Sequence, residues 1–430
     1  MIRLYNARIL TMRDNEPLFA GEIWVEDSRI VYVGETPAPL KTPEQGFEKE
    51  IDCEGNLLMP GFKNAHTHSA MTFLRSSADD MPLASWLNEQ VFPYEAKLTP
   101  EDIYSLSRVA ILEYLTSGIT AAMEMYLTPV TIAKAFQDAG MRLVQVGGVN
   151  NFSQSPELLE EWYTGLNGKN ALTSFELGFH AEYTCSHELI KKLADLAHKY
   201  KAPVFTHISE TAGEVEGCIE RYGMTPVAFL ASEGMFDYGG AGYHLVHTTP
   251  DDIRIMKEKG ISAVTNPGSN TKLASGIAPV GDYLRNGIMV GIGTDGPASN
   301  NCLDMFREMF LVTGLAKLRE KDASAVPAAD VLKMAASDGA KIMRIPDADC
   351  LAEGKLADII LLDLKQPNMQ PINNIPCNIV YSGSKLNVMM TMVGGKVLYE
   401  NRCGEQVFNV GEECAEIYRD AQRIRDRILG

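Results

Sequence analysis

The stretch Leu58-Met59-Pro60-Gly61-Phe62-Lys63-Asn64-Ala65-His66-Thr67-His68 is the most informative part of this 430-residue chain. An apolar run leads into two histidines that are separated by one residue. Side chains two residues apart in a β-strand point to the same side, so His66 and His68 can bind one metal ion together. A His-x-His pair alone is a weak signal, because histidines are also common on surfaces and in cores.

Three further apolar runs end in polar residues, at His207, at His244 and at Asp295, and Glu210 follows His207 by three residues. Four such clusters indicate strands whose ends meet at one place. Three imidazoles and one carboxylate suit one divalent ion, with Zn²⁺ preferred and Fe²⁺ as the alternative. A metal in such a site lowers the pKa of a bound water to about 7. The predicted ligands are His66, His68, His207 and Asp295.

The middle of the chain alternates short β-rich runs with helical stretches such as 100–117 and 187–200. Eight βα units over about 290 residues predict an α/β fold with a (β/α)₈ barrel of the TIM type, in which chemistry collects at the C-terminal ends of the strands. The expected strands are 58–66, 119–125, 143–149, 175–180, 203–207, 242–246, 261–266 and 289–295.

The two ends of the chain differ from the middle, because their patterns predict short strands without intervening helices. These strands are expected at 2–11, 21–26 and 29–34 and again at 359–363, 388–392 and 394–398. We expect the termini to pair into one small β-sandwich domain. Residues 1–56 and 347–430 would form this domain, including a helix over 411–429. The barrel would occupy residues 57–346.

Composition argues against several classes of partner. The net charge of −17 opposes a broad basic surface for nucleic acid or anionic membranes. No apolar run approaches the roughly 20 residues of a membrane span, and the N-terminus lacks the features of a secretory signal. The eight cysteines occur singly, which is typical of reduced thiols. We expect a cytoplasmic protein with a small-molecule substrate, and a homo-oligomer is compatible with the sequence.

Other polar residues near the predicted strand ends are candidates for acid and base chemistry. Glu210 suits proton transfer between a water molecule and a substrate, and it equally suits a charge at a helix N-terminus. His244 ends an apolar run, whereas His247 precedes a helix start. His180 ends the fourth strand and is a candidate substrate contact. Asp295 could also serve only as a turn residue.

Longer motifs accompany these residues, in the segments 266–280, 293–301 and 353–358. With them the chain resembles the amidohydrolase superfamily over nearly its whole length. It is most similar to the branch of S-adenosylhomocysteine and 5′-methylthioadenosine deaminases, which also holds triazine chlorohydrolases and guanine deaminases. The resemblance implies the same four metal ligands, and it implies catalytic roles for Glu210, His244 and Asp295.

The resemblance also implies how a substrate is held. It assigns Glu95, in the loop after the first barrel strand, to the ribose hydroxyls of a nucleoside. His180 is assigned to the purine ring. Trp86, on the same loop as Glu95, and Met71 complete the expected substrate contacts.

The chain departs from the family pattern at two places, and one of them changes the expected substrate. Homocysteine-binding members carry arginines after the third strand, where this chain has Gly147 and Gly148. Without a cation to pair with an amino-acid carboxylate, we expect adenosine, 5′-deoxyadenosine or 5′-methylthioadenosine to be preferred over S-adenosylhomocysteine. Thr265 replaces a frequent histidine, with no consequence that we can name. The fourth strand offers no lysine to bridge two metals, so one metal ion per chain is expected.

The sequence therefore favours a metal-dependent aminohydrolase that converts the 6-amino group of an adenine nucleoside to a carbonyl and releases ammonia. An aminohydrolase or chlorohydrolase acting on guanine, a pterin or an s-triazine is the alternative enzyme. Glu95 discriminates between them, because those substrates carry no ribose. A catalytically inactive scaffold is the alternative outside enzymes, and the complete ligand set argues against it.

Overall fold

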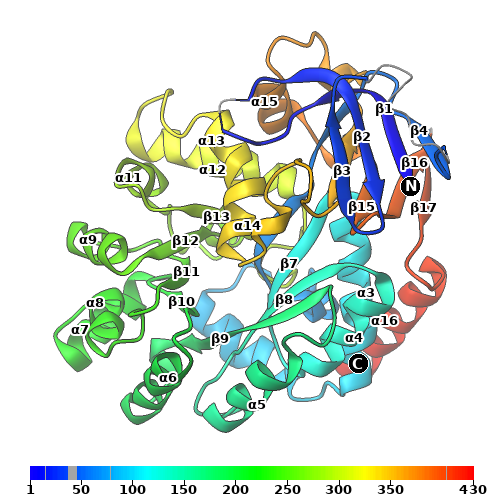
Figure 1. Ribbon diagram of the computed structural model, residues 1–430. Helices are drawn as coiled ribbons and strands as arrows, with labels where there is room; N and C mark the ends of the chain where they lie inside the picture. The colour runs from blue at the N-terminus through cyan, green and yellow to red at the C-terminus, as the bar shows by residue number, and fades with distance from the viewer. Residues whose placement is uncertain (15, 37–45, 78, 403) are drawn as a thin grey trace.

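Two β-sheets organise the chain (Figure 1). The structure is a computed structural model that describes residues 1–14, 16–36, 46–77, 79–402 and 404–430. Eight parallel strands follow one another in chain order, which confirms the (β/α)₈ barrel. They are β6 (Phe62–Thr67), β7 (Ile119–Met125), β8 (Arg142–Val146), β9 (Thr173–Ala181), β10 (Val204–Ile208), β11 (Gly240–His244), β12 (Ile261–Thr265) and β13 (Val290–Ile292).

Hydrogen bonds between the first barrel strand and the segment that follows the last strand bring the barrel to closure. The amide of Thr294 donates to Oδ1 of Asn64 over 2.8 Å, and Nδ2 of Asn64 donates to Oγ1 of Thr294 over 2.7 Å. The barrel strands are covered on both faces, which is why every residue of β7 and β8 is buried, including Glu124, Arg142 and Gln145. Side chains from most of the strands fill the interior, among them Ala65, Met123, Val144, Phe205, Tyr243 and Val264.

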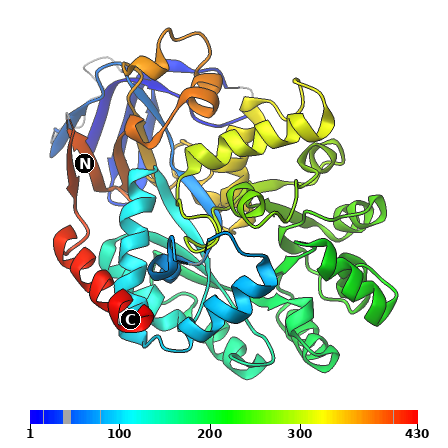
Figure 2. The same cartoon turned by 180° about the vertical axis from the view of Figure 1, so that it is seen from behind.

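Helices surround the barrel between successive strands (Figures 1 and 2). Several start at a threonine followed by proline; Thr99 forms a capping box with Asp102 in this way. The helices are α1 (Leu83–Ser85), α2 (Phe92–Glu95), α3 (Pro100–Thr116), α4 (Pro129–Ala139), α5 (Pro156–Leu166), α6 (His187–Tyr200), α7 (Ala212–Tyr222), α8 (Pro226–Ser232), α9 (Pro250–Lys259), α10 (Pro267–Lys272), α11 (Val280–Arg285), α12 (Met305–Glu320), α13 (Ala328–Lys333), α14 (Gly339–Ile342), α15 (Ile375–Cys377) and α16 (Cys414–Leu429).

The termini build the second sheet, as expected. Its strands run in the order β17-β16-β15-β14-β5-β1-β2-β3, and β4 pairs with β1. The β2–β3 turn meets the β15–β16 turn, since a Cβ at Gly395 would lie 1.9 Å from the oxygen of Asp27. Ala357 bridges the two turns, because its amide donates to the oxygen of Ser28 and its oxygen accepts the amide of Gly395. Its strands are β1 (Ile2–Ile9), β2 (Phe19–Glu26), β3 (Arg29–Gly34), β4 (Lys49–Asp52), β5 (Leu57–Pro60), β14 (Ile359–Leu362), β15 (Val388–Val393), β16 (Lys396–Arg402) and β17 (Glu405–Phe408).

The strand expected over 58–66 is two strands in different sheets. β5 pairs in parallel with β1 and antiparallel with β14, whereas β6 pairs with β7. Gly61 separates them, because a Cβ there would lie 2.1 Å from Cγ2 of Thr120. The chain therefore crosses from the terminal sheet into the barrel at a glycine, the residue type that lets the backbone approach Thr120 this closely.

Three further expectations are adjusted by the structure. The strand expected over 242–246 ends at His244, since His244 and Leu245 have φ of 71° and 47° and turn the chain. The last barrel strand is shorter than the expected 289–295 and ends at Ile292. The C-terminal helix α16 lies against α3 of the barrel (Figure 2), where Arg427 pairs with Asp102. The division of the chain into domains at residues 57 and 346 stays a prediction.

The seven cysteines within the described residues are all free, and Cys403 lies outside them. Within the described parts of the chain, no helix is both long enough and apolar enough to cross a membrane.

Candidate active site

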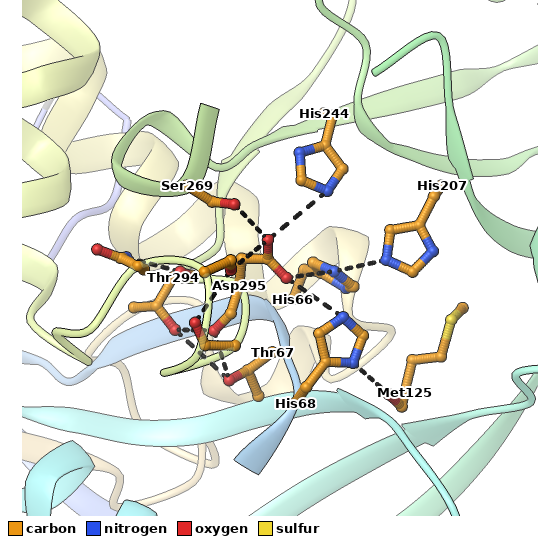
Figure 3. A network of polar contacts seen from close by, with 12 residues as sticks. His66, Thr67, His68, Met125, His207, His244, Ser269, Thr294 and Asp295 are labelled. Atoms are coloured by element: carbon orange, nitrogen blue, oxygen red, sulfur yellow. Dashed lines mark hydrogen bonds and ion pairs between the residues drawn. The ribbon is translucent and has the colours of Figure 1, made fainter. Parts of the chain in front are cut away.

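Three imidazoles and one carboxylate converge at the C-terminal ends of the barrel strands (Figure 3). Nε2 of His66 and Nε2 of His68 lie 3.5 and 3.2 Å from Oδ1 of Asp295. Nε2 of His207 lies 3.1 Å from Nε2 of His66. One ligand atom from each of the four residues lies within 4.8 Å of the others. Four donors facing one point, three of them imidazole nitrogens, fit a single divalent cation.

Hydrogen bonds on the outer side of two histidines orient their rings. Nδ1 of His207 lies 2.7 Å from the main-chain oxygen of His180, and Nδ1 of His68 contacts that of Met125. A carbonyl only accepts, so we assign the ring proton to Nδ1 in both. Nε2 then presents its lone pair to the cation, as is usual for metal-binding histidines.

Burial sets the protonation of the ligands. It lowers the pKa of His66 to about 3 and the pKa of His207 well below its usual value, so both are neutral at pH 7, the form that binds a metal. Burial is the largest single influence on the pKa of His68 and lowers it, but the hydrogen bond to Asp295, the charges of Asp295 and Glu124 and the contact with Met125 together raise that pKa to about 9. A cation bound beside His68 displaces this proton.

Asp295 is held by its backbone and by two serines. Its φ of 57° is uncommon for a residue with a side chain, and its amide donates to the oxygen of His66 over 3.0 Å. The hydroxyls of Ser269 and Ser299 donate to Oδ2 over 2.6 and 2.9 Å. Oδ1 is thereby left facing the histidines.

Glu210 and His244 lie beside this cluster. Nε2 of His244 is 3.8 Å from Oε2 of Glu210 and 3.9 Å from Oδ2 of Asp295. Nδ1 of His244 is 2.7 Å from Oδ1 of Asn270, which fixes the ring. Burial raises the pKa of Glu210, which favours the protonated form of its carboxyl group. The pair can therefore exchange protons with a molecule bound against the cluster.

A cavity of about 510 Å³ opens above the cluster. None of the described residues that line it is a lysine or an arginine. His66 is completely buried beneath the cavity floor. All other residues that the sequence singled out line the wall or the floor, namely Met71, Trp86, Glu95, His180, Glu210, His244, His68, His207 and Asp295.

Glu95 and Trp86 offer unused polar groups at this cavity. Both belong to the segment of α1, the π-helical turn Trp86–Val91 and α2, which forms one wall. Oε1 of Glu95 and Nε1 of Trp86 are buried without hydrogen-bond partners. Burial raises the pKa of Glu95 to about 7, although Tyr126 lowers it in part. An unsatisfied buried polar group costs roughly 1–3 kcal/mol, so a ligand with hydroxyl groups would relieve this cost.

The structure also reveals supporting residues that the sequence analysis missed. Asn270, Ser269 and Ser299 lie within the recognised motifs, but their contacts depend on how loops from different strands meet. The carboxylate of Glu124, on β7, accepts the amide of Ser69 at 2.9 Å and so holds the turn after His68. Glu214, on α7, reads in the sequence as an ordinary acidic residue at a helix start.

The remaining histidines lie away from the cluster, as the sequence indicated. His187 pairs with Glu233 over 3.0 Å, and His198 pairs with Asp237 over 3.1 Å. His247 contacts the oxygen of Ser275 over 2.7 Å and supports the loop after β12.

Comparison with known proteins agrees with this geometry. The model of the amidohydrolase family matches residues 57–398, and the chain belongs to this family. It is 38% identical over 439 residues to a 5-methylthioadenosine/S-adenosylhomocysteine deaminase of Pelotomaculum thermopropionicum, with 99% of each chain covered. A protein of the same description from Syntrophomonas wolfei is 39% identical over 392 residues, with 89% of each chain covered.

Solved structures show the same architecture. An adenosine deaminase from Xanthomonas campestris with bound zinc superposes with a TM-score of 0.91 at 29% identity, covering 100% of this chain and 98% of the other. Atrazine chlorohydrolase from Arthrobacter aurescens gives a TM-score of 0.88 at 22% identity, covering 99% and 100%. At that identity the second likeness is one of fold alone.

Proposed function

We propose that this protein is a metal-dependent hydrolytic deaminase of an adenine nucleoside. The observation that carries the proposal is the placement of Glu210 and His244 beside the four-ligand cluster, under a cavity lined by Glu95, whose Oε1 has no hydrogen-bond partner. The deaminase relatives support it, as does the zinc-bound adenosine deaminase of similar fold.

One divalent ion per chain, Zn²⁺ for this set of ligands, supplies a water of lowered pKa when bound to His66, His68, His207 and Asp295. Side chains of the protein then transfer the protons. Glu210 takes one proton from the water and delivers it to N1 of the purine. His244 and Asp295 orient the water and help to pass its second proton to the departing amino group. Oxygen adds at C6, the C6–N bond breaks, and the products are ammonia and the 6-oxo nucleoside.

The cavity favours an uncharged 5′ end on the nucleoside. Glu95 accepts hydrogen bonds from the ribose hydroxyls, and His180 contacts the purine. No lysine or arginine among the described lining residues pairs with an amino-acid carboxylate. We therefore place adenosine, 5′-deoxyadenosine and 5′-methylthioadenosine ahead of S-adenosylhomocysteine as substrates.

A screen for ammonia release tests the proposal. The panel holds adenosine, its 5′-deoxy and 5′-methylthio analogues, S-adenosylhomocysteine, free adenine, guanine, a pterin and an s-triazine. We expect the first three to give the highest kcat/KM. Preference for guanine, a pterin or an s-triazine would establish the alternative enzyme, and no turnover in metal-loaded protein would favour a scaffold.

The proposal also covers the location and the partners of the protein. We place the protein in the cytoplasm, with a small-molecule substrate and without nucleic-acid or membrane partners. A homo-oligomer is compatible with this function, and light scattering measures the oligomeric state.

A further inference from the structure

A second buried glutamate, Glu214, holds the turn that carries Glu210. Glu214 lies in the first turn of α7, and its residue is 7% exposed. Its Oε1 accepts the amide of Ser209 over 2.8 Å, and its Oε2 accepts the amide of Glu210 over 2.7 Å. Glu214 does not line the cavity, so it reaches the site only through the backbone of these two residues.

The turn itself has an uncommon backbone. β10 ends at Ile208, and Ser209 follows with a φ of 53°, in the left-handed region that favours glycine. The oxygen of Ser209 accepts the amides of Val246 and His247 over 3.0 and 2.9 Å, which joins this turn to the one after His244. The carboxylate of Glu214 binds the turn from its amide side. Without it, the direction of the Glu210 side chain loses a main restraint.

Glu214 is not needed to cap its own helix. Thr211 is the N-cap of α7, and its hydroxyl accepts the amide of Glu214 over 3.2 Å. The carboxylate instead reaches back past the cap to residues outside the helix. Burial raises the pKa of Glu214 to about 7, so the ionised group is costly at this position. Departures from the most stable choice concentrate at functional sites.

We propose that Glu214 is a positioning residue that holds the main chain of Ser209 and Glu210 so that the Glu210 carboxyl group faces the substrate. The inference rests on the proposed function, because Glu210 is there the group that delivers the proton. Glu214 itself does not touch substrate or metal.

Steady-state kinetics of Glu214→Gln tests the inference. The amide keeps one acceptor but turns an NH₂ group toward the second backbone N–H. We expect kcat to fall at least about 10-fold, while KM changes less than about two-fold and metal content stays at the wild-type level. An unchanged kcat would overturn the inference, and so would loss of metal, which would place the effect at His207.

Glu182→Gln is the matched control. Glu182 is equally buried and pairs with Arg221 at the other end of α7, over 2.6 Å. The Glu182 side chain does not line the cavity. We expect its kcat to stay within about two-fold of wild type. If Glu182→Gln lowered kcat as much as Glu214→Gln, loss of any buried carboxylate would explain the effect and the inference would fail.

A double-mutant cycle separates positioning from general damage. If Glu214 acts through Glu210, then Glu214→Gln should change kcat less than about two-fold in a Glu210→Gln background. An equal loss in both backgrounds would overturn the inference. Glu214→Asp, which keeps the charge but withdraws the carboxylate from both amides, replaces the glutamine variant in this cycle if that variant does not fold.

Amide hydrogen exchange gives a readout that needs no activity. In wild type the amides of Ser209 and Glu210 should be protected, and Glu214→Gln should speed exchange at least 10-fold in a peptide spanning 207–213. A peptide spanning 62–70 serves as an internal reference. Unchanged exchange in the first peptide would refute the inference. Wild-type protein that exchanges as expected but releases no ammonia would instead count against the proposed function alone.

Discussion

Nδ1 of His207 lies 2.7 Å from the main-chain oxygen of His180. His180 therefore supports the metal ligand His207 with its main-chain oxygen and lines the cavity with its own ring. Because β9 and β10 are neighbours in the barrel, this contact is built into the sheet. The metal cluster and the wall that meets the substrate are coupled at His180.

We predict one metal ion per chain, lost when a central ligand is removed. His207→Ala should reduce the metal content of purified protein to a small fraction of wild type, because only three of the four ligands, His66, His68 and Asp295, remain. Elemental analysis after gel filtration measures this. His198→Ala, which alters an exposed ion pair, is the control. Two metals per chain, or full occupancy in His207→Ala, would contradict the assignment.

Glu210→Gln should lower kcat about 100- to 10,000-fold, the usual contribution of a general acid or base. The amide keeps the shape of the side chain but cannot deliver a proton. Metal content should not change, since Glu210 is outside the four-ligand group. Ammonia release under saturating substrate decides it. A variant that keeps a third of the wild-type kcat would move the proton transfer to another residue.

Glu95→Ala should erode the preference for nucleosides over free adenine. Its unpaired Oε1 is the acceptor that we assign to the ribose hydroxyls. A hydrogen bond to a charged group contributes about 1.5–3 kcal/mol, so kcat/KM for the nucleoside should fall about 10-fold or more, with little change for adenine. Competitive assays with both substrates measure the ratio. A parallel loss for both would show that Glu95 supports the cavity wall instead.

Gly148→Arg should improve activity toward S-adenosylhomocysteine relative to 5′-deoxyadenosine. A Cβ at Gly148 would meet only ordinary contacts, the nearest at 3.4 Å from Cγ of Met125, whereas one at Gly147 would lie 2.2 Å from Cδ1 of Leu159. A new charge-assisted hydrogen bond predicts a gain of about 10-fold in the ratio of kcat/KM values. Gly148→Met is the uncharged control, and an equal shift with methionine would rule out an electrostatic cause.

Stability should depend on pH through Glu176, which lies on β9. Burial raises its pKa to about 7, although Arg344 lowers it in part. A raised pKa favours the folded state below about pH 4.5, and this advantage is lost as the pH rises through 7. From pH 5 to pH 8 the wild type should therefore lose about 2–3 kcal/mol of unfolding free energy relative to Glu176→Gln. Urea unfolding of both proteins at pH 5 and at pH 8 tests this. The same difference in unfolding free energy between wild type and Glu176→Gln at both pH values would contradict the prediction.

Local sequence patterns were sufficient for the barrel and for the strand-end side chains. β7 and α6 match the ranges 119–125 and 187–200, because uniform burial and helical periodicity are both visible in the sequence. His207 could be placed because an apolar run ends there. Such signals depend only on neighbours along the chain.

Contacts between distant segments were not predictable in this way. The break between β5 and β6 follows from the approach of Thr120 to Gly61, which no local pattern reveals. The hydrogen bond between His244 and Asn270 joins the end of β11 to α10, and His244 makes it from a backbone with a φ of 71°. Glu214 was missed for a different reason: its partners lie only four and five residues before it, but a glutamate in the first turn of a helix reads as an ordinary acidic residue.

The place of β5 bears on how the nascent chain matures. β5 leaves the ribosome early, but its antiparallel partner β14 follows about 300 residues later. The segment that carries His66 and His68 begins immediately after β5, so it stays tethered to an unfinished sheet during most of synthesis. Metal capture is therefore expected after translation, and a nascent chain stalled before residue 359 should be released without bound metal.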